Sequence, residues 1–557
     1  MKTWKTNLEE TKQRYINWWN HKGIILSMWE HFQEGVKPHA DIAPPAPARD
    51  LSQKWFDPQW RAEYLDWYVA HSSLMADMLP VANTQLGPGS LAAILGGVFE
   101  GGEDTIWIHP DPNFNDEIVF NPEHPNWLLH KELLKACKAK ANGNYFVGMP
   151  DLMEGLDVLA ALKGTDMVLL DTVMQSEVLE QQMQQINDIY FKVFDELYDI
   201  IREGDEMAFC YFSSWAPGKM SKLQSDISTM ISQDDYRRFV QPFIREQCQK
   251  IDYTLYHLDG VGAMHHLPAL LEIEELNAIQ WTPGVGEPQG GSPKWYDLYK
   301  KILAGGKSVM ACWVTLEELK PLLDHIGADG VHLEMDFHNE REVEQAMRII
   351  EEYTGSSSSV SADVHTNQPV GEQDNAQESI RIREEKSQEE DRMKPLYDAI
   401  VAGKLEPAVE VTKDAIAAGV LPQDIINGYM ITAMGEVGQR FQDGKAFVPQ
   451  LLMAGRAMKG ALELLKPLLA GNASATIGKI VIGTVKGDLH DIGKNLVASM
   501  LEGCGFEVIN IGIDVTCDKF VEAVKENKAD ILCMSALLTT TMLSLIHISE
   551  PTRPRLI

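Results

Sequence analysis

A polar stretch in the second half of the chain sets the strongest limit on how this sequence can fold. Residues 355–392 read GSSSSVSADVHTNQPVGEQDNAQESIRIREEKSQEEDR and contain almost no large apolar side chains. Such a segment cannot bury enough apolar surface to offset the entropy lost on ordering. We therefore predict a flexible linker over 355–392, with separately folded parts at residues 1–354 and from residue 393 onward.

The N-terminal part alternates strand-like apolar runs with amphipathic helical runs. Five such strand-like runs are MAFCYFSSW (207–215), TLYHLDG (254–260), NAIQWTPG (277–284), KSVMACW (307–313) and GVHLEMD (330–336). Repeated strand-then-helix units predict a parallel sheet covered by helices. The length of the segment favours one (β/α)8 TIM barrel, an α/β fold, over two small open sheets.

Polar and aromatic residues lie at or near the ends of these runs. Active sites of TIM barrels lie at the carboxyl ends of the strands, so residues there are candidates for chemistry. The candidates are His257, Asp259, Trp281, Cys312 and Glu334.

The C-terminal part changes its pattern once. Residues 393–472 hold several runs with apolar side chains at helical spacing, which predict a small helical bundle. From residue 478 the order is strand, helix, strand, helix, strand, the opening of a doubly wound, Rossmann-like sheet that we assign to residues 473–542.

The first strand-to-helix loop of that sheet carries the motif D-x-H-x-x-G. Its residues are Asp488, His490 and Gly493. One imidazole nitrogen can bind a metal while the other donates to a carboxylate, and glycine lets a ligand approach the backbone. The alternative is that Asp488 and His490 only cap the helix.

The wider pattern, DLHDIG followed by SAL and preceded by GQRFQDGKAFVPQLLMAGRAMK, resembles the cobalamin-binding module of methionine synthase and of methanogen and acetogen corrinoid proteins. The resemblance implies that cobalamin is the cofactor and that His490 binds its cobalt from below. It implies that Asp488 and Thr541 tune the proton of that histidine. The remaining implied cofactor contacts are Gly493, Ser535, Leu537, Phe447 and Leu451.

Two of these contacts have an alternative role. Phe447 and Leu451 would cover the upper face of the cofactor, or they would be ordinary core residues of the helical bundle. The family pattern also has a later Gly-Gly pair and two more strands, in place of which this chain reads SLIHISEPTRPRLI. We therefore expect a truncated domain over 473–542 and a non-native tail over 543–557.

The N-terminal part resembles the uroporphyrinogen decarboxylase superfamily in NTQLGPGSLAAILGG (83–97), SDISTMISQDDYRRFVQPF (225–243) and YHLDGVGAMHHL (256–267). That superfamily contains decarboxylases and methyltransferases that serve corrinoid proteins, and fusion to a corrinoid module favours the methyltransferases. Those methyltransferases often hold zinc through His-x-Cys and a later Cys. Here the matching residues are His257, Asp259 and Glu334, with Asp336 as a substitute for Glu334.

These residues allow two interpretations. His257, Asp259 and Glu334 form an N/O/O set that zinc accepts, and zinc bound there could polarise a methyl ether or alcohol oxygen. Alternatively His257 and Asp259 are a metal-free polar pair that binds substrate. In both interpretations His257 and Asp259 are the expected catalytic residues.

Charge and cysteine content exclude some classes of partner. The formal net charge is −32, from 81 acidic and 49 basic residues, so nucleic acid and anionic membranes are not expected partners. The seven cysteines are scattered and form no C-x-x-C pair, which is typical of a cytoplasmic protein.

The sequence thus predicts a cytoplasmic, corrinoid-dependent methyltransferase fused to its own carrier. Its partners would be a small-molecule methyl donor or acceptor, and a second methyltransferase or a corrinoid reactivase. Two alternatives remain: a uroporphyrinogen decarboxylase-like enzyme with a vestigial carrier, and a non-catalytic corrinoid-binding sensor.

Overall fold

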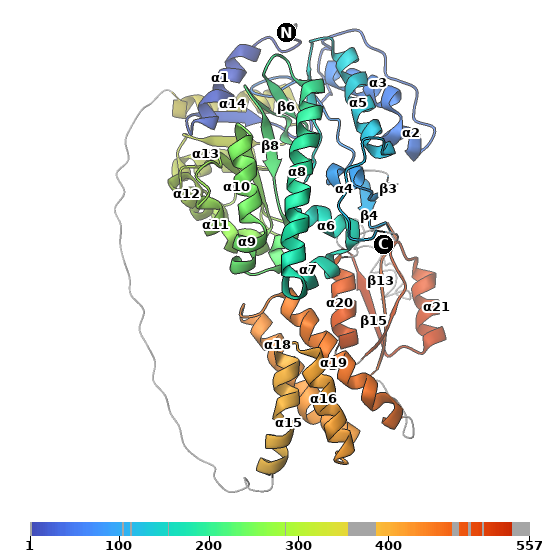
Figure 1. The fold of residues 1–557 in the computed structure, drawn as a ribbon. Helices are drawn as coiled ribbons and strands as arrows, with labels where there is room; N and C mark the ends of the chain where they lie inside the picture. Colours follow the sequence, from blue (N-terminus) through green and yellow to red (C-terminus); the bar gives the residue numbers. More distant parts are fainter. Residues whose placement is uncertain are drawn as a thin grey trace, which may run out of the picture. The chain divides into compact units, whose positions relative to one another are not determined.

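The computed structural model describes residues 3–102, 105–111, 114–153, 155–284, 286–354, 386–469, 478–487, 492–503 and 506–536. The chain divides into two compact units, Met1–Ser359 and Val360–Ile557. Figure 1 colours the chain by sequence, from blue at the N-terminus to red at the C-terminus. Each unit is described by itself.

The strands of the N-terminal unit are short. They are β1 (Ile24–Ser27), β2 (Val81–Ala82), β3 (Val98–Gly101), β4 (Ile106–His109), β5 (Phe146–Met149), β6 (Met207–Phe209), β7 (Ser214–Ala216), β8 (Met220–Leu223), β9 (Tyr253–Asp259), β10 (Ala278–Thr282), β11 (Ser308–Ala311) and β12 (Val331–Glu334).

Helices connect and cover these strands. They are α1 (Leu8–Trp19), α2 (Leu51–Phe56), α3 (Pro58–His71), α4 (Ser90–Ile94), α5 (Pro125–Ala141), α6 (Gly155–Lys163), α7 (Thr165–Met174), α8 (Ser176–Ile201), α9 (Gln233–Phe239), α10 (Gln241–Lys250), α11 (Leu267–Leu271), α12 (Tyr296–Ala304), α13 (Leu316–Ile326) and α14 (Glu340–Thr354).

Parallel pairing dominates this unit and confirms the predicted parallel sheets. Six strands pair in the order β1-β12-β11-β10-β9-β8, and every neighbouring pair is parallel. A second sheet has the order β2-β5-β6-β7, of which only the β6–β7 pair is antiparallel. Helix α12 packs on β11, α14 on β1, and both α5 and α8 on β5, as expected for strand-helix units.

The prediction of one closed barrel is not met, because the described strands form separate sheets with no closed ring of pairing. One interruption lies after β6, where the chain reverses through Tyr211–Ser213 with Phe212 at φ 61° and returns as β7. The run 207–215 is therefore two strands rather than one. The segment after it, which is not among the five predicted strand-like runs, contains strand β8.

At the other interruption, between β1 and β2, a side chain takes the place of a paired strand. The backbone N–H of Asp77 donates to the Leu26 carbonyl at 2.9 Å, and the Leu26 N–H donates to Asp77 Oδ2 at 3.1 Å. The other carboxylate oxygen accepts from Arg14 Nε at 2.5 Å. Asp77 is buried, so β1 keeps its backbone partners on the side where no strand lies.

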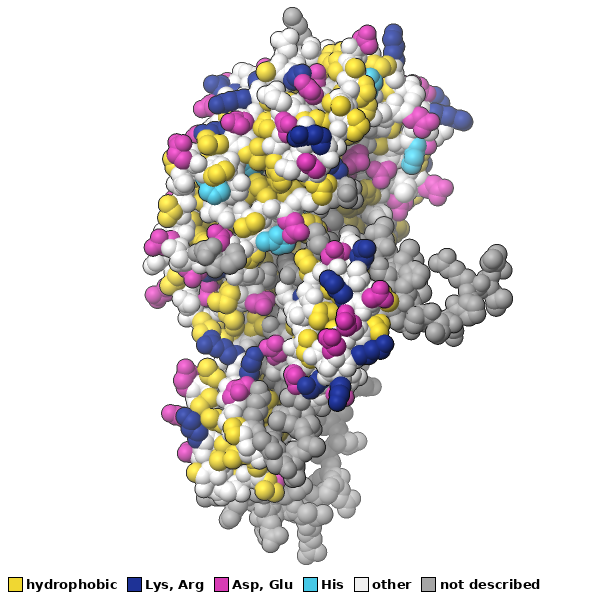
Figure 2. Space-filling view, turned by 90° about the vertical axis from the view of Figure 1, so that its right-hand side faces the viewer, with side chains coloured by type: hydrophobic (Ala, Val, Ile, Leu, Met, Phe, Trp, Pro, Cys, Tyr) yellow, Lys and Arg dark blue, Asp and Glu magenta, His cyan; other side chains and the backbone are white. Residues whose placement is uncertain are grey.

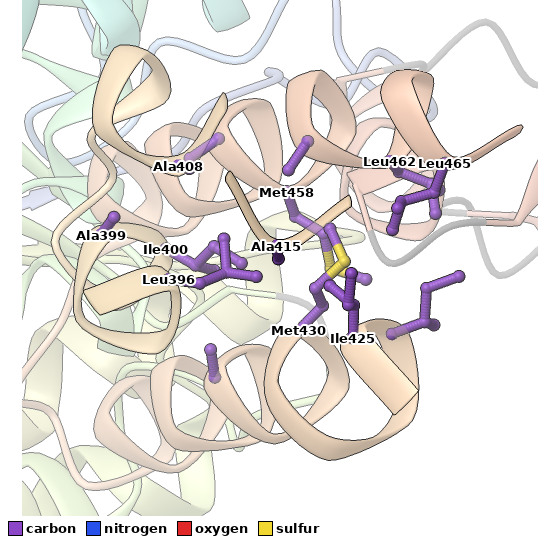
Figure 3. Close-up of a cluster of buried hydrophobic side chains, with 14 of the residues drawn as sticks. Leu396, Ala399, Ile400, Ala408, Ala415, Ile425, Met430, Met458, Leu462 and Leu465 are labelled. Carbon is purple, nitrogen blue, oxygen red and sulfur yellow. The ribbon is translucent and has the colours of Figure 1, made fainter. Parts of the chain in front are cut away.

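The C-terminal unit begins with a helical bundle, as predicted, but its first helix begins at Lys386, inside the segment predicted as a linker. Its helices are α15 (Lys386–Val401), α16 (Leu405–Ala417), α17 (Pro422–Ile425), α18 (Ile431–Gln442) and α19 (Val448–Leu469). Pro422 lies in the first turn of α17, where the missing N–H costs nothing. Figure 3 shows the core of the bundle, in which apolar side chains from these helices meet, among them Leu396, Ile400, Ile425, Met458 and Leu462.

A small sheet follows the bundle. Its elements are β13 (Lys479–Thr484), α20 (Ile492–Gly503), β14 (Glu507–Asn510), α21 (Cys517–Asn527) and β15 (Ile531–Ser535). The strand order is β14-β13-β15 and both pairs are parallel, which confirms the predicted Rossmann-like topology. Phe520 of α21 packs on Val481 and Val485 in the core of this sheet.

Charges of both signs cover the surface. On the face drawn in Figure 2, Lys and Arg lie singly or in small groups among Asp and Glu. In the part of the chain that the structure describes, no helix combines the length and the apolar character needed to cross a membrane.

The Asp77 contacts give the first prediction. Asp77→Ala leaves the buried Leu26 N–H without an acceptor, so we expect the free energy of unfolding to fall by about 1–3 kcal/mol. Asp77→Asn keeps an acceptor and should cost less. All 13 tryptophans lie in residues 1–354. Urea unfolding monitored by tryptophan fluorescence therefore reports the unfolding of the N-terminal unit alone.

The matched control is Asp205→Ala, because the Asp205 side chain is 92% exposed. It should change the free energy of unfolding by less than about 0.5 kcal/mol. Equal losses of unfolding free energy in Asp77→Ala and Asp205→Ala would show that the Asp77 side chain does not stabilise the unpaired side of β1.

Candidate functional site

The polar residues at the carboxyl ends of β9 and β10 face one another because the strands are in parallel register. His257 is paired with Gln280, and Asp259 with Thr282. Residues two apart on a strand point to the same side, so His257 and Asp259 share one face of β9. The predicted pair therefore lies together at the carboxyl edge of the sheet.

A third residue, Asp226, joins this pair. It follows β8, and its carboxylate lies with one ligand atom each of His257 and Asp259 within 4.8 Å of one another. We call Asp226, His257 and Asp259 the acidic–histidine group. The sequence prediction missed Asp226, although a carboxylate three residues after the short run MSKL was a usable signal.

His257 is neutral in this group. Burial lowers the pKa of His257 to about 3, helped by the positive charge of Lys222. The Nδ1 atom of His257 contacts Gln280 Oε1. Gln280 Nε2 donates to Thr282 Oγ1 at 2.7 Å and to Cys312 Sγ at 3.0 Å, which orients the amide oxygen toward the histidine. Nδ1 is thus the protonated nitrogen, and Nε2 keeps a free lone pair.

Desolvation raises the pKa of both carboxylates of the group. Burial raises the pKa of Asp259. Asp226 has exposed surface, yet desolvation by the surrounding protein, and then the charge of Asp157, raise its pKa well above the usual range. Asp157 itself accepts from the Asp226 and Ile227 backbone N–H groups at 2.8 and 3.0 Å. Added positive charge at this point would stabilise all three carboxylates.

Lys222 supplies the positive charge inside the unit at this edge. It is 2% exposed, and its Nζ donates to Asp151 Oδ2 at 2.6 Å and to Gln224 Oε1. The same ammonium lies 4.8 Å from the ring centroid of Tyr211. The Tyr211 ring in turn lies 6.4 Å from the His257 ring and lines a pocket of about 660 Å³.

Glu334 does not belong to the acidic–histidine group, in contrast to the sequence hypothesis. It ends β12, and its Oε2 accepts from Cys312 Sγ at 3.4 Å. Cys312 and Gln280 thus lie between Glu334 and His257 along one polar chain. Burial raises the pKa of Glu334 to about 8, and its Oε1 has no hydrogen-bond partner among the described residues.

The candidate Trp281 and Tyr256, the neighbour of His257, are core residues. Trp281 is fully buried and packs edge-on against Trp295, with ring centroids 5.0 Å apart. Tyr256, which the strand pattern places beside His257, accepts a hydrogen bond from Tyr236 at 3.1 Å and is also buried.

In the C-terminal unit, the structure describes the surroundings of the D-x-H-x-x-G motif rather than its centre. Asp488, His490, Leu537 and Thr541 lie outside the described residues, and Gly493 lies in the first turn of α20. Ser535 ends β15 and is paired with Thr484, the last residue of β13. Two hydroxyl side chains therefore lie side by side at the carboxyl edge of the sheet.

Residues on both sides of the motif loop are held by contacts with the end of β14 and the loop after it. Gly487 has φ 83°, a left-handed conformation that favours glycine, and its N–H donates to Asp514 Oδ1 at 2.8 Å. Lys494, in the first turn of α20, donates to Asn510 Oδ1 at 3.0 Å. Ligands of open α/β sheets bind outside the carboxyl ends of the strands, so these residues fit a cofactor there.

The bundle residues Phe447 and Leu451 lie at the start of α19. The Phe447 N–H donates to Gln450 Oε1 at 2.9 Å, and its side chain is half-buried. Leu451 is 3% exposed and packs with Val437 and Ala454. This packing favours the core interpretation of Leu451, while Phe447 retains exposed surface.

Comparisons with known proteins agree with this arrangement. Two family profiles, both described as B12 binding domain, match residues 393–466 and 478–555. Trimethylamine corrinoid protein 1 of Methanosarcina mazei is 46% identical over 155 residues, which are 28% of this chain and 72% of that protein. The dimethylamine corrinoid protein of Methanosarcina barkeri is 43% identical over 154 residues, 28% of this chain and 72% of that protein.

Solved structures show a further similarity. The methanol:cobalamin methyltransferase complex of Methanosarcina barkeri is 33% identical, over 28% of this chain and 61% of that chain, with a TM-score of 0.26. This chain therefore spans less than two thirds of the chain it matches there.

The C-terminal unit is thus a B12-binding module, with a helical domain followed by a Rossmann-like domain. The chain belongs to the corrinoid protein family.

The buried Glu334 gives a prediction on pH and stability. Its pKa is about 8 in the folded protein, against 4.5 for the free side chain. The folded state therefore binds more protons than the unfolded state between these values. The stability that Glu334 contributes is fully present at pH values below 4.5 and is lost as pH rises through 8.

Glu334→Gln removes this titration while keeping a neutral side chain of the same shape. Unfolding in urea should show the wild type losing at least about 1 kcal/mol relative to Glu334→Gln between mildly acidic and mildly basic pH. The opposite titration of His257 is common to both proteins and cancels in the difference. A difference that stays constant with pH would contradict the prediction.

Proposed function

We propose that this protein is a corrinoid-dependent methyltransferase fused to its own carrier. In this proposal the N-terminal unit binds a small methyl donor or acceptor, and the C-terminal unit carries cobalamin. The observation that carries the proposal is the presence, in one chain, of a B12-binding module and a unit with a buried polar site at the carboxyl ends of parallel strands.

The comparisons support methyl transfer rather than another use of cobalamin. The relatives are named as trimethylamine and dimethylamine corrinoid proteins, and a methanol:cobalamin methyltransferase complex is among the similar structures. Joining the catalytic unit to the carrier raises the effective concentration of one for the other. A second methyltransferase and a corrinoid reactivase remain proposed partners.

The roles of the N-terminal residues follow from their charge states. Neutral His257 offers Nε2 as a base or a metal ligand, because its Nδ1 proton is held by Gln280. Asp226 and Asp259 lie close enough to act with it on one substrate oxygen or one cation. Glu334, protonated at neutral pH, stabilises the Cys312–Gln280–His257 chain rather than contacting the substrate.

The acidic–histidine group also fits a divalent metal. Zinc binds one imidazole nitrogen and two carboxylate oxygens readily, and the neutral state of His257 is the state that binds metal. Asp226, His257 and Asp259 would hold the ion. There it would supply Lewis-acid polarisation of a substrate oxygen.

In the C-terminal unit the proposed cofactor contacts follow the motif. His490 would bind the cobalt, Asp488 would accept the proton of the other imidazole nitrogen, and Thr541 would extend that hydrogen-bond chain. Gly493, Ser535 and Leu537 would bind the nucleotide part of the cofactor, and Phe447 would contact its corrin ring. Cobalamin, when bound, supplies a cobalt atom that accepts and releases methyl groups.

The role of His490 is testable by spectroscopy. We expect the wild type to bind cobalamin with a protein histidine as lower ligand, which labelling of the histidines with nitrogen-15 reveals in the electron paramagnetic resonance of the cobalt(II) form. His490→Ala should lose this label-dependent splitting and most methyl transfer. His338→Ala is the control, because that side chain is 82% exposed. Label-dependent splitting in His490→Ala would show that another histidine is the ligand.

Metal analysis tests the N-terminal group. After dialysis against zinc, the wild type should retain about one ion, and both His257→Ala and Asp226→Asn should retain far less. Glu334→Gln is the matched control and should retain zinc, because Glu334 lies outside the group. Zinc-free wild-type protein that still transfers methyl groups would identify the group as a metal-free polar site.

A further inference from the structure

The pocket beside Tyr211 has features that the proposed function leaves unexplained. Its volume is about 660 Å³, within the range of small-molecule sites. Six aromatic side chains lie in its wall: Trp29, Trp55, Trp60, Tyr64, Tyr68 and Tyr211. All lie in the N-terminal unit.

One charged group in this wall has no counter-charge. Arg61, on α3, is 7% exposed, and its Nη2 donates to the Asn83 carbonyl at 3.2 Å. Its Nη1 is buried and has no hydrogen-bond partner among the described residues, and no carboxylate there forms an ion pair with the guanidinium. Burial lowers the pKa of Arg61 only to about 10, so it stays charged at neutral pH.

A buried, unpaired guanidinium is costly, and native proteins pair such groups with an anion. The neighbours that face Arg61 do not supply one. The groups whose electrostatics act on its charge are Cys137, Cys210 and Tyr64, none of which is a carboxylate, and burial raises the pKa of Cys137 and Cys210. The missing partner therefore belongs to a ligand.

A second buried polar atom in the same wall points to the same conclusion. His31 lines the pocket, and its Nε2 is buried without a hydrogen-bond partner among the described residues. Burial lowers the pKa of His31 to about 4, so the ring is neutral and can donate one hydrogen bond to an anion.

The remaining charges of the wall disfavour a cationic ligand. Glu30 is the acidic residue among the lining side chains, against the two bases Lys54 and Arg61. Both bases lie 5.3 Å from the ring centroid of Trp55, so cations of the protein already occupy the faces of that ring. A methylated ammonium ion placed here would meet positive charge.

We propose that this pocket binds a small organic carboxylate. Its carboxylate pairs with Arg61 and accepts from His31, and its apolar body lies against the aromatic wall. Binding by this pocket goes beyond the proposed function. Only the further step, that the bound carboxylate is the methyl donor or acceptor, rests on it.

The test is calorimetric titration of the full-length wild type without cobalamin. The probes are 4-methoxybenzoate, its neutral analogue 4-methoxybenzamide, and tetramethylammonium. We expect the carboxylate to bind at least about tenfold more tightly than the amide, as is typical when a charged hydrogen bond is lost, and tetramethylammonium to bind most weakly. Equal affinity for carboxylate and amide, or tighter binding of tetramethylammonium, would overturn the proposal.

Variants locate the contact. Arg61→Gln should weaken 4-methoxybenzoate binding at least about tenfold and leave the amide little changed. Lys54→Gln removes a half-buried charge from the same wall and should cost less than about threefold. Equal losses of 4-methoxybenzoate affinity in both variants would show that the pocket attracts the carboxylate by its overall positive charge, without a direct ion pair to Arg61. If Arg61→Gln does not fold, the wild-type comparison of carboxylate and amide decides alone.

Failure of the two proposals can be told apart. Carboxylate binding without methyl transfer would contradict the proposed function and leave the pocket proposal intact. Methyl transfer from uncharged donors, with no carboxylate binding, would contradict the pocket proposal and leave the proposed function intact.

Discussion

Parallel pairing of strands determines where the chemistry of this protein lies. Strands that run in one direction bring all their carboxyl ends to one edge, so residues distant in sequence meet there. In the N-terminal unit this edge holds His257, Asp259, Cys312 and Glu334. In the C-terminal unit it holds Thr484 and Ser535.

The buried ammonium group at the edge of the N-terminal sheet is paired with a buried carboxylate. Lys222 points from β8 into the unit and is paired with Asp151, a residue 71 positions away in sequence. Its neighbour Ser221 contacts Tyr190 of α8 at 2.6 Å. Such pairs fix the positions of the polar strand ends. The acidic–histidine group needs fixed strand ends, because its three side chains come from different parts of the chain.

The success of sequence prediction here depends on whether the controlling contact is local. The D-x-H-x-x-G motif and the helical segment before it were enough to predict a B12-binding module through their resemblance to known modules, and the matching family profiles confirm it. The shared face of His257 and Asp259 also follows from the period of a strand. Strand β8 escaped prediction because its polar residues find partners that lie far away in sequence. Glu334 was placed with His257, whereas Gln280 and Cys312 fill the space between them.

The side chain that replaces a strand next to β1 has an evolutionary consequence. Because Asp77 satisfies the backbone of β1, residues 28–76 need not keep strand register with the rest of the unit. That same excursion supplies Trp29, His31, Trp55, Arg61 and Tyr68 to the aromatic pocket. Insertions, deletions and substitutions there can reshape the pocket wall while β9 and β10 keep His257 in place. A lineage carrying this fold could therefore acquire new ligands by drift in one segment, with its reactive centre left untouched.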